Sequence, residues 1–576
     1  MKSVATNIFR YFSASNQSLM LRSLLRKKSL PDILRDANAG HTDGHHDPEL
    51  KRVLGVRDLT SMGIAAVIGA GIFSTIGKAA FSGGPGVVFL FAIIAVTCGF
   101  VALCYAEFAA RIPAAGSAYT YTYITIGEVA AWIIGWALIL EYAISNVVVS
   151  ISWSGYFVNL LEGAHIHLPS WMTIDPKTAQ DKFETALAQG NAVEGMAWAS
   201  APEIAGMKII FNAPAFMIVA LITVLAYVGI RESKKGANIM VVIKLVVLAF
   251  IVVLGIFYID TDNWTPFVPN GFTGVLGGVS AIFFAYIGFD SISTTAEECH
   301  NPQRDLPRGM IYSLLICTLI YVIVTLVITG MVNYSEFKGV TDPLAYVFEK
   351  IHLQKIGYIV SAGAVIAATS ALLVYQLGQP RIWMSMSRDG LLPKKFSVIH
   401  PRFHTPSFAT IITGIVVAVP ALFIDIDVVT DLTSIGTLFA FILVCVGVLY
   451  LPKRERVAGD KTFHMPRING RWIVPALLLI FIYGYSERIS NSFSLHNSNE
   501  EIMFLIFLLI TTVIAVITFL KKLSLIPILG LLCCLYLMVE IPPKSWLVFF
   551  GWMSFGLLIY LGYGRKKSKL AVGSRQ

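Results

Sequence analysis

Long apolar segments recur along nearly the whole chain, and they limit the folds that it can adopt. Each has about 20 mostly apolar residues, the length that an α-helix needs to cross a lipid bilayer. Only 14% of the 576 residues are charged, against about 25% in soluble domains. We therefore predict an all-α polytopic membrane protein. Fourteen spans are expected, at 58–80, 86–110, 128–160, 211–230, 236–259, 275–297, 309–332, 356–386, 407–424, 430–451, 473–488, 502–520, 524–540 and 545–563.

Basic residues are distributed unevenly between the two sides of this predicted bundle. With the N-terminus inside, 34 of the 44 Lys and Arg residues fall on the cytoplasmic side and 9 on the outside, and Lys244 lies within a span. The positive-inside rule then places both termini in the cytoplasm. The net charge of +9 could suggest a nucleic acid partner, but where the charges fall argues for membrane topology instead. No nucleic acid is therefore predicted as a partner. The expected location is the cell membrane, plasma or inner.

The parts of the chain outside the spans offer little chemistry. Residues 1–57 are polar and basic without a signal-peptide core. His41, His45, His46 and Asp47 could form a metal cluster, but a solvated tail is favoured because no Cys or spaced His pair supports it. The seven cysteines have no metal-ligand spacing. No metal or cofactor is predicted, and no enzyme, because the eleven histidines all fall in tails or loops.

Two loops are long enough for structure of their own, and both lie on the predicted outside. The loop from Leu161 to Lys208 is expected to be a cap, with a helix around Asp175–Ala188. Asp342–Ile351 is expected to form a short surface helix. The third and eighth spans exceed one straight crossing, so we expect them to tilt or to extend beyond the bilayer.

Glycine interrupts two of the spans. Gly69-Ala70-Gly71 lies inside the first, within Ile64–Gly77, and a second break is expected within Phe284–Phe289 of the sixth. Two Gly-interrupted segments in matching halves point to the substrate site of a transporter. The first break frees N–H groups that suit a carboxylate, and the second frees carbonyls that suit an ammonium. Close helix packing is the alternative reading of Gly69 and Gly71.

Ionisable residues inside a membrane are costly and are functional candidates. Lys244 has apolar neighbours on both sides in the fifth span. Burial disfavours its charged form, so it could bind and lose a proton as access alternates. The alternative is a structural ion pair with Glu141 or Asp290. Glu141 is either the proton-relay partner of Lys244 or a helix–helix hydrogen-bonding group.

The other charged residues lie near span ends. Glu107 and Arg111 are predicted to form an i,i+4 pair. Glu297 and Glu298 end the sixth span at the cytoplasmic side. Arg381 and Arg388 are expected to be anchors near the cytoplasmic end of the eighth span. Phe283, Phe284 and Phe289 could gate the site or could simply pack.

Several runs together resemble the amino acid–polyamine–organocation superfamily and its cationic amino acid transporter branch. The runs are Gly69-Ala70-Gly71-Ile72-Phe73, Pro113-Ala114-Ala115-Gly116-Ser117-Ala118-Tyr119, Leu140-Glu141-Tyr142, Phe283-Phe284-Ala285-Tyr286-Ile287-Gly288-Phe289-Asp290, Ala296-Glu297-Glu298, Asn301-Pro302-Gln303-Arg304-Asp305-Leu306-Pro307 and Met386-Ser387-Arg388-Asp389-Gly390-Leu391-Leu392-Pro393. The resemblance covers most of residues 50–452 and Pro527–Lys567. Two features depart from the pattern. The stretch from Trp472 to Lys522 resembles an inserted pair of helices, and Ala70 stands where some relatives carry a hydroxyl.

The resemblance implies two inverted five-helix repeats with broken helices 1 and 6. We divide the chain into a tail (1–57), a ten-helix transport core (58–451, repeats 58–259 and 275–451), four additional helices (452–563) and a C-terminal tail (564–576). Implied substrate contacts are Val67, Ala70, Gly71, Phe284, Ala285 and Ile287. The predicted site also includes Ile68, Gly69, Ile72, Gly288 and Phe289, which complete the two breaks. The resemblance also implies that Lys244 takes the place of a sodium ion, which suggests proton coupling.

The prediction is therefore a secondary active symporter of protons and an L-amino acid, neutral or cationic, that works by alternating access. Two alternatives stay open. One is an amino acid exchanger without net proton coupling, and the other is a membrane amino acid sensor that binds without transport. An ion channel is disfavoured by the paired breaks and the single buried lysine.

Overall fold

The computed structural model describes residues 26–28 and 54–573, except for 113–116, 191–192, 194, 205, 230–232, 341, 404, 453–461 and 493–498. The histidines considered as alternative metal ligands in the N-terminal tail lie outside these residues, as does the Pro113–Gly116 part of one motif.

Most of the described chain is helical, as expected where a bilayer leaves backbone groups no water to bond. Nine helical segments in this part of the chain are long and apolar enough to cross a membrane, and four shorter helices are apolar as well. Since Val56–Arg111 contains two expected spans, these segments account for all fourteen. The core helices are α3 (Val56–Val67), η2 (Gly71–Thr75), α4 (Ile76–Gly83), η3 (Gly84–Gly86), α5 (Val87–Arg111), α7 (Glu128–Gly163), α10 (Ala213–Val228), α11 (Ser233–Gly255), α13 (Val279–Tyr286), η7 (Phe289–Glu298), α14 (Pro302–Met331), α16 (Gln354–Arg388), α17 (Ser407–Ala421) and α18 (Ile426–Leu449).

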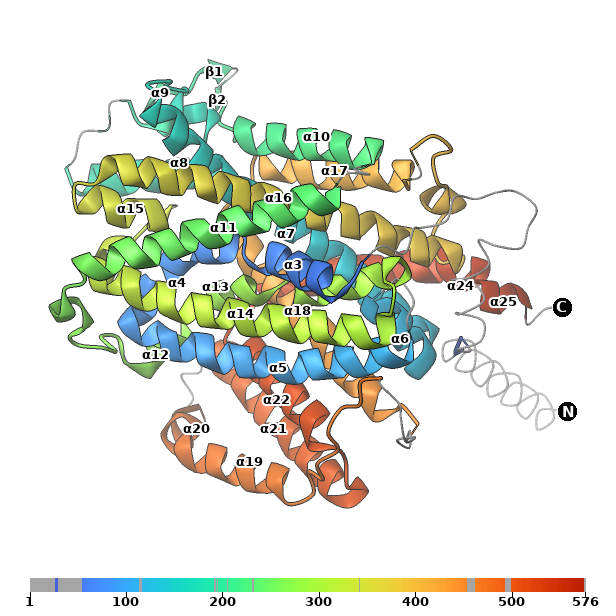
Figure 1. Cartoon of the computed structure of the whole chain (residues 1–576). Helices are drawn as coiled ribbons and strands as arrows, with labels where there is room; N and C mark the ends of the chain where they lie inside the picture. The colour runs from blue at the N-terminus through green and yellow to red at the C-terminus, as the bar shows by residue number, and fades with distance from the viewer. Residues whose placement is uncertain are drawn as a thin grey trace, which may run out of the picture.

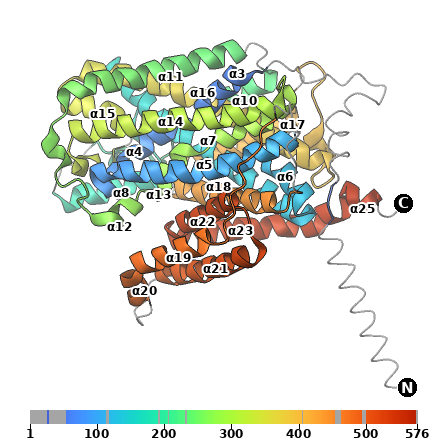
Figure 2. The same cartoon turned by 60° about the horizontal axis from the view of Figure 1, so that its bottom comes forward.

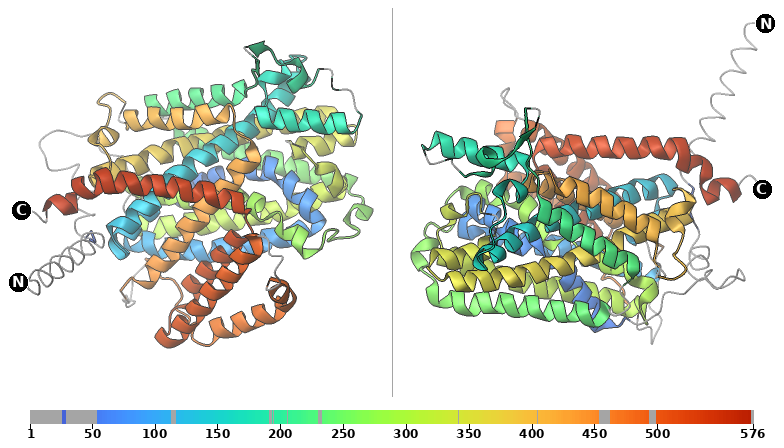
Figure 3. Two further views of the ribbon diagram at one scale, coloured as in Figure 1. Left: turned by 180° about the vertical axis from the view of Figure 1, so that it is seen from behind. Right: turned by 90° about the horizontal axis from the view of Figure 1, so that it is seen from above.

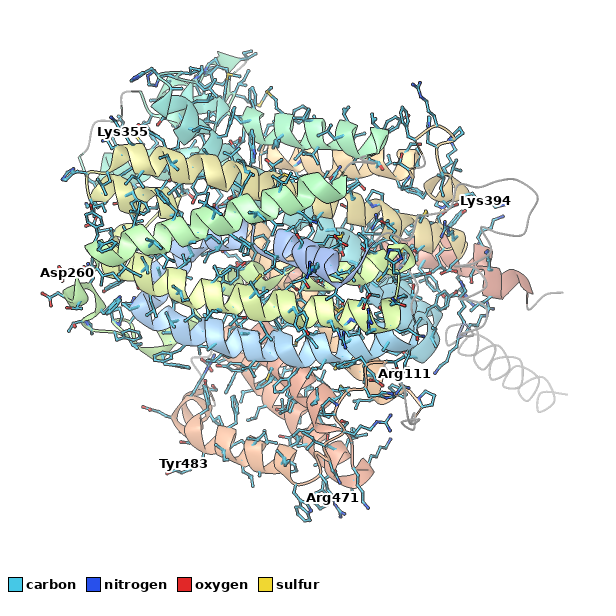
Figure 4. All side chains as sticks on the ribbon, in the orientation of Figure 1. Arg111, Asp260, Lys355, Lys394, Arg471 and Tyr483 are labelled. Atoms are coloured by element: carbon cyan, nitrogen blue, oxygen red, sulfur yellow. The ribbon has the colours of Figure 1, made fainter. Side chains whose placement is uncertain are left out.

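The long helices run side by side, with α5, α14, α11 and α16 visible across the bundle in Figure 1. Helix α7 lies at the centre of the bundle. In its most apolar part 89% of the residues are buried, against 28% in Asn238–Tyr258, the segment that contains most of α11. The 36 residues of α7 and the 35 of α16 confirm the two long spans. Charged residues mark both ends of the bundle in Figure 4: Asp260 and Lys355 at one, Arg111 and Lys394 at the other.

The end with Asp260 and Lys355, here called the cap end, carries the long loops. Both predicted loop helices are present, as α8 (Pro176–Ala188) and α15 (Pro343–Lys350). The prediction that α15 lies on the surface is wrong, because its apolar residues Leu344, Val347 and Phe348 are buried in the core. Asp175 caps α8 by accepting a hydrogen bond from the Thr178 N–H at 2.9 Å. The remaining elements here are η4 (Ser170–Met172), α9 (Ala197–Ser200), β1 (Glu203–Ile204), β2 (Met207–Lys208), η5 (Ile256–Tyr258), η6 (Thr261–Trp264), α12 (Gly271–Leu276) and η8 (Tyr334–Phe337); β1 and β2 pair antiparallel.

The opposite end, here called the tail end, gathers residues 26–28 and the C-terminal segment. Lys28 pairs with Asp389 at 2.6 Å, and Asp389 also accepts a 2.6 Å hydrogen bond from the Tyr119 hydroxyl. The Glu128 N–H donates to the Arg26 carbonyl at 2.8 Å. The elements at this end are α6 (Ser117–Thr125), η9 (Lys394–Ser397), η10 (Tyr560–Gly564), α24 (Arg565–Lys567) and α25 (Lys569–Gly573).

Glu107 and Arg111 form the predicted i,i+4 pair, with Arg111 Nε 2.8 Å from Glu107 Oε1. The second oxygen of Glu107 accepts the Met465 N–H at 2.8 Å. Arg381 pairs with Glu298 at 2.7 Å. These contacts support the interpretation of the span-end charges as structural groups.

The C-terminal helices form two layers against the core. Helix α22 (Leu525–Val539) packs on α18 and α5, and α23 (Pro543–Ile559) lies along α7, as Figure 3 shows from behind. The Trp136 indole N–H donates to the Trp552 carbonyl, and the Trp552 indole N–H donates to the Trp136 carbonyl. Helices α19 (Ile473–Gly484), α20 (Ser486–Ser492) and α21 (Asn499–Lys521) lie outside α22, at the edge of the molecule in Figures 1 and 2.

Candidate functional site

The first break begins one residue earlier than the glycines alone suggest, at Ile68. Helix α3 ends at Val67, and Ile68 leaves helical geometry at φ −77°, ψ 88°. Ala70 already has helical angles, and Gly71 begins the single π-helical turn η2. The predicted interruption is therefore present, but it is centred on Ile68 and Gly69 rather than on Gly69-Ala70-Gly71. At this position the carbonyls of residues 65–68 turn to side chains of other helices, Lys244, Tyr321 and Tyr375, as described below.

The second break separates α13 from η7. Helix α13 ends at Tyr286, Ile287 is extended, and Gly288 has φ +112°. This left-handed region favours glycine. A Cβ on Gly288 would lie 2.8 Å from the Tyr375 hydroxyl oxygen and 2.9 Å from Ala66 Cβ. Gly288 therefore allows both the turn and the close approach of the first break.

The two breaks touch each other directly. A Cβ on Gly71 would lie 2.3 Å from Ala285 Cα, so no side chain fits there. The Thr75 hydroxyl lies 2.8 Å from the Gly71 carbonyl oxygen and 2.9 Å from the Ala281 carbonyl oxygen, so it connects the two broken helices. Gly71 therefore serves close packing, the alternative left open from the sequence, while the bend itself falls at Ile68–Gly69.

Lys244 of α11 is fully buried, and its ammonium faces backbone carbonyls rather than a carboxylate. Lys244 Nζ donates to Ile68 O at 2.7 Å, Ala65 O at 3.1 Å and Ala367 O at 3.4 Å. Two of these acceptors end α3, and the third belongs to α16. The alternative ion pair with Glu141 or Asp290 is not formed in the described part of the chain.

Two tyrosines that the sequence analysis did not select join the breaks. The Tyr321 hydroxyl of α14 lies 2.8 Å from Val67 O and 2.9 Å from Ala285 O. The Tyr375 hydroxyl of α16 lies 3.4 Å from Ala66 O and 3.2 Å from Ile287 O. The only signal in the sequence was a hydroxyl in an apolar span, which needs a partner when buried. With 22 tyrosines in the chain, that signal does not single out these two.

Glu141 and Asp290 form a separate buried acidic group and interact electrostatically with each other. Among the described residues, Glu141 Oε2 and both carboxyl oxygens of Asp290 have no hydrogen-bond partner of ordinary geometry. The Thr437 side chain lies close to Glu141, and backbone N–H groups at the start of η7 lie close to Asp290. The Tyr105 and Tyr142 hydroxyls, within electrostatic range of both carboxylates, are likewise unpartnered there.

The structure brings the other predicted site residues around the same breaks. Val67, Ile68, Ala70 and Ile72 from the first break are buried, as are Phe284, Ala285, Ile287 and Phe289 from the second. The Phe289 ring lies edge-on to Tyr105, with ring centres 6.2 Å apart, and near Phe441. Phe283 also contacts Phe441. These rings are thus part of a packed aromatic group.

The arrangement suits a small zwitterion better than it suits a chemical reaction. Carbonyls that end α3 and α13 face the junction of the breaks and can accept from an ammonium, and the N-terminal end of η2 favours an anion. Within the described residues no group of His, Cys, Asp and Glu could hold a metal ion. The groups present can bind, orient and release a charged solute.

The chain is similar to known proteins along nearly its whole length. A family model described as "Amino acid permease" matches residues 54–516, and one described as "C-terminus of AA_permease" matches residues 523–568. The chain is 37% identical to the branched-chain amino acid permease of Bacillus subtilis (strain 168), over 96% of this chain and 100% of that protein. It is 34% identical to the methylthioribose transporter of the same organism, with the same coverage. It is 32% identical to the vacuolar cationic amino acid transporter 2 of Arabidopsis thaliana, over 96% of this chain and 94% of that one.

Proposed function

The chain belongs to the amino acid permease family, and we propose that it is a proton-coupled symporter of an L-α-amino acid that works by alternating access. In this proposal it lies in the cell membrane with both termini in the cytoplasm, and neutral and cationic amino acids are both candidate substrates. The names of the relatives cover branched-chain and cationic amino acids and methylthioribose. The two breaks hold the amino acid by its charged ends, with Val67–Ile72 and Phe284–Phe289 around it.

One observation carries the proposed coupling: the Lys244 ammonium rests on three carbonyl oxygens from α3 and α16. Three such oxygens around one point also suit a bound monovalent cation, and here the cation is part of the chain. An ion that is covalently attached cannot be carried across, but its proton can. Loss of that proton removes charge-assisted hydrogen bonds worth about 1.5–3 kcal/mol each and loosens the end of α3. Glu141 is proposed as a second proton-carrying group.

The test is uptake by the purified full chain in proteoliposomes, with labelled L-leucine, L-alanine and L-arginine. We expect accumulation with an imposed proton gradient, no response to a sodium gradient, and loss of gradient-driven uptake in Lys244→Ala. Lys355→Ala is the matched control, because Lys355 is exposed at the cap end. Lys244→Arg keeps a cation that does not deprotonate, so it should retain exchange and lose proton-driven accumulation.

Different outcomes separate the alternatives. Full gradient-driven uptake by a folded Lys244→Ala protein would exclude the coupling role of Lys244. Flux that requires amino acid inside the vesicles would indicate an exchanger. Binding without any flux would indicate a sensor.

A further inference from the structure

Side chains from three other helices contact the carbonyl oxygens at the end of α3. An α-helix leaves its last four carbonyls without intrahelical partners. Here Lys244 serves Ala65 and Ile68, Tyr375 serves Ala66, and Tyr321 serves Val67. The same two tyrosines serve the second break at Ala285 and Ile287. The acceptors proposed for a substrate ammonium are thus already occupied by phenol hydroxyls.

The two hydroxyls differ in how well they fill this role. Tyr321 lies at 2.8 and 2.9 Å from its two carbonyls, whereas Tyr375 lies at 3.4 and 3.2 Å. Ordinary O–H···O bonds measure about 2.5–3.0 Å. A phenol has one proton and cannot donate fully to two carbonyls, whereas an ammonium has three. Ala66 O and Ile287 O are therefore the carbonyl pair that a substrate ammonium would serve better than the hydroxyl does.

On the basis of the proposed function, we infer that the Tyr375 hydroxyl holds the position of the substrate ammonium in the empty carrier and is exchanged for it on binding. The amino acid donates to Ala66 O and Ile287 O, and the hydroxyl moves away. On release the hydroxyl returns, so that the two buried carbonyls keep a donor while the carrier is empty. Tyr375 is a positioning residue for the empty state.

The Tyr375 hydroxyl also interacts electrostatically with two buried carboxylates. Glu141 and Asp290 lie within electrostatic range of Tyr375, and three of their four carboxyl oxygens have no ordinary hydrogen-bond partner in the described structure. The Tyr142 ring lies perpendicular to that of Tyr375, at 5.8 Å between ring centres. When the amine binds and the hydroxyl moves, the electrostatic environment of the two buried carboxylates would therefore change.

The position is built for the hydroxyl by the second break. Only the absence of a Cβ at Gly288 lets the Tyr375 oxygen reach both carbonyls, since that Cβ would lie 2.8 Å from it. Gly288 has φ +112° for the turn itself. Gly288 therefore both permits the break in the sixth span and leaves room there for the Tyr375 hydroxyl.

The test compares net uptake with exchange in Tyr375→Phe, which keeps the ring and removes the hydroxyl. Net uptake requires the empty carrier to return, whereas exchange requires only the loaded carrier. A net hydrogen bond corresponds to a factor of about three to ten. The amino acid used is whichever of L-leucine, L-alanine and L-arginine the wild-type chain takes up fastest. We expect its Kd to fall about three- to tenfold and its maximal net uptake to fall by a similar factor. Exchange in preloaded vesicles should stay within about twofold of wild type.

Two matched variants show what other roles would look like. Tyr321→Phe breaks the short bonds and should lower net uptake and exchange together. Tyr346→Phe removes a hydroxyl that donates to Glu336 outside the spans, at 3.1 Å, and should change neither. Structures of the wild-type chain with and without the amino acid give an independent measurement. The Tyr375 hydroxyl should leave hydrogen-bond distance of Ile287 O when the amino acid is bound.

The outcomes separate this inference from the proposed function. Wild-type vesicles that take up none of the three amino acids would contradict the proposed function itself. Wild-type uptake together with a weaker Kd in Tyr375→Phe, or with equal losses of net uptake and exchange, would overturn the inference alone. If Tyr375→Phe does not fold, an unmoved hydroxyl in the amino-acid-bound structure would also overturn it.

Discussion

Gly69 and Gly71 are separated only by Ala70, and they have different roles. Gly69 lies in the bend after α3, where its Cβ would be 3.0 Å from Ala371 Cβ. Gly71 already belongs to the π-helical turn, and its Cβ would overlap the backbone of Ala285. The first is a contact that a few tenths of an ångström could relieve. The second requires one of the two broken helices to move.

We expect Gly71→Ala to destabilise the protein by about 1–3 kcal/mol, the usual cost of overpacking, and to abolish most uptake. Gly99→Ala is the matched control, because Gly99 lies inside α5 and nothing comes within 4 Å of its Cβ position. Gly99→Ala should stabilise α5 by up to about 1 kcal/mol, because alanine has a higher helix propensity than glycine. Thermal melting of the purified variants and vesicle uptake measure both. Equal melting temperatures for the two variants would show that the breaks do not touch as described.

Ion pairs at the two ends of the bundle differ in burial, and their contributions to stability should differ accordingly. At the tail end, the side chains of Lys28 and Asp389 are 11% and 10% exposed. At the cap end, those of Lys78 and Asp427 are 40% and 59% exposed. Exposed pairs contribute about 0–1 kcal/mol, whereas removing one member of a buried pair costs about 3–5 kcal/mol. The described tail residues are thus an integral contact of α16, together with Tyr119 of α6.

Asp389→Asn should therefore lower the melting temperature clearly, because Lys28 and the Tyr119 hydroxyl both lose an anionic acceptor. Asp427→Asn should leave it nearly unchanged. The difference should persist in high salt, since buried pairs are screened weakly. A melting temperature of Asp389→Asn equal to that of Asp427→Asn would mean that residues 26–28 do not hold this end together.

The pair of helices suggested by the sequence to be an insertion is also peripheral in the whole molecule. Helices α19 and α21 pack on each other and on α22. The ends of this segment meet, because Asn469 and Ser524 form an antiparallel bridge and the Leu525 N–H donates to Ile468 O at 2.8 Å. The segment can therefore be removed without stretching the chain.

Deletion of residues 469–524, with Ile468 joined to Leu525, should leave a folded transporter with uptake within about threefold of the full chain. Glu540→Gln belongs in the same variant, because Glu540 otherwise loses its 2.9 Å partner Arg488. The full chain with Glu540→Gln alone is the control. Expression, monodispersity and uptake are the measurements. A folded deletion variant without uptake would show that the peripheral helices take part in transport.

The spans, the two breaks and the isolated lysine could be predicted from the sequence because the bilayer restricts local choice. Backbone groups in hydrocarbon must bond within a helix, so apolar length predicts a span. A glycine or an amine inside a span is conspicuous for the same reason. The long spans, both loop helices and the Glu107–Arg111 pair follow from this local chemistry. The repeat boundaries and the roles of Lys244 and Glu141 stay predictions.

Only the tertiary structure decided which groups meet. Lys244 could have paired with Glu141 or Asp290 by composition, yet its ammonium lies on carbonyls of Ala65, Ile68 and Ala367. Those carbonyls carry no signal of residue type, because every residue has one. Tyr321 and Tyr375 were undetectable for the same reason, since their acceptors are backbone atoms brought together by two separate breaks. Sequence thus determined where helices form and fail, while packing determined which donor serves each carbonyl that the failures expose.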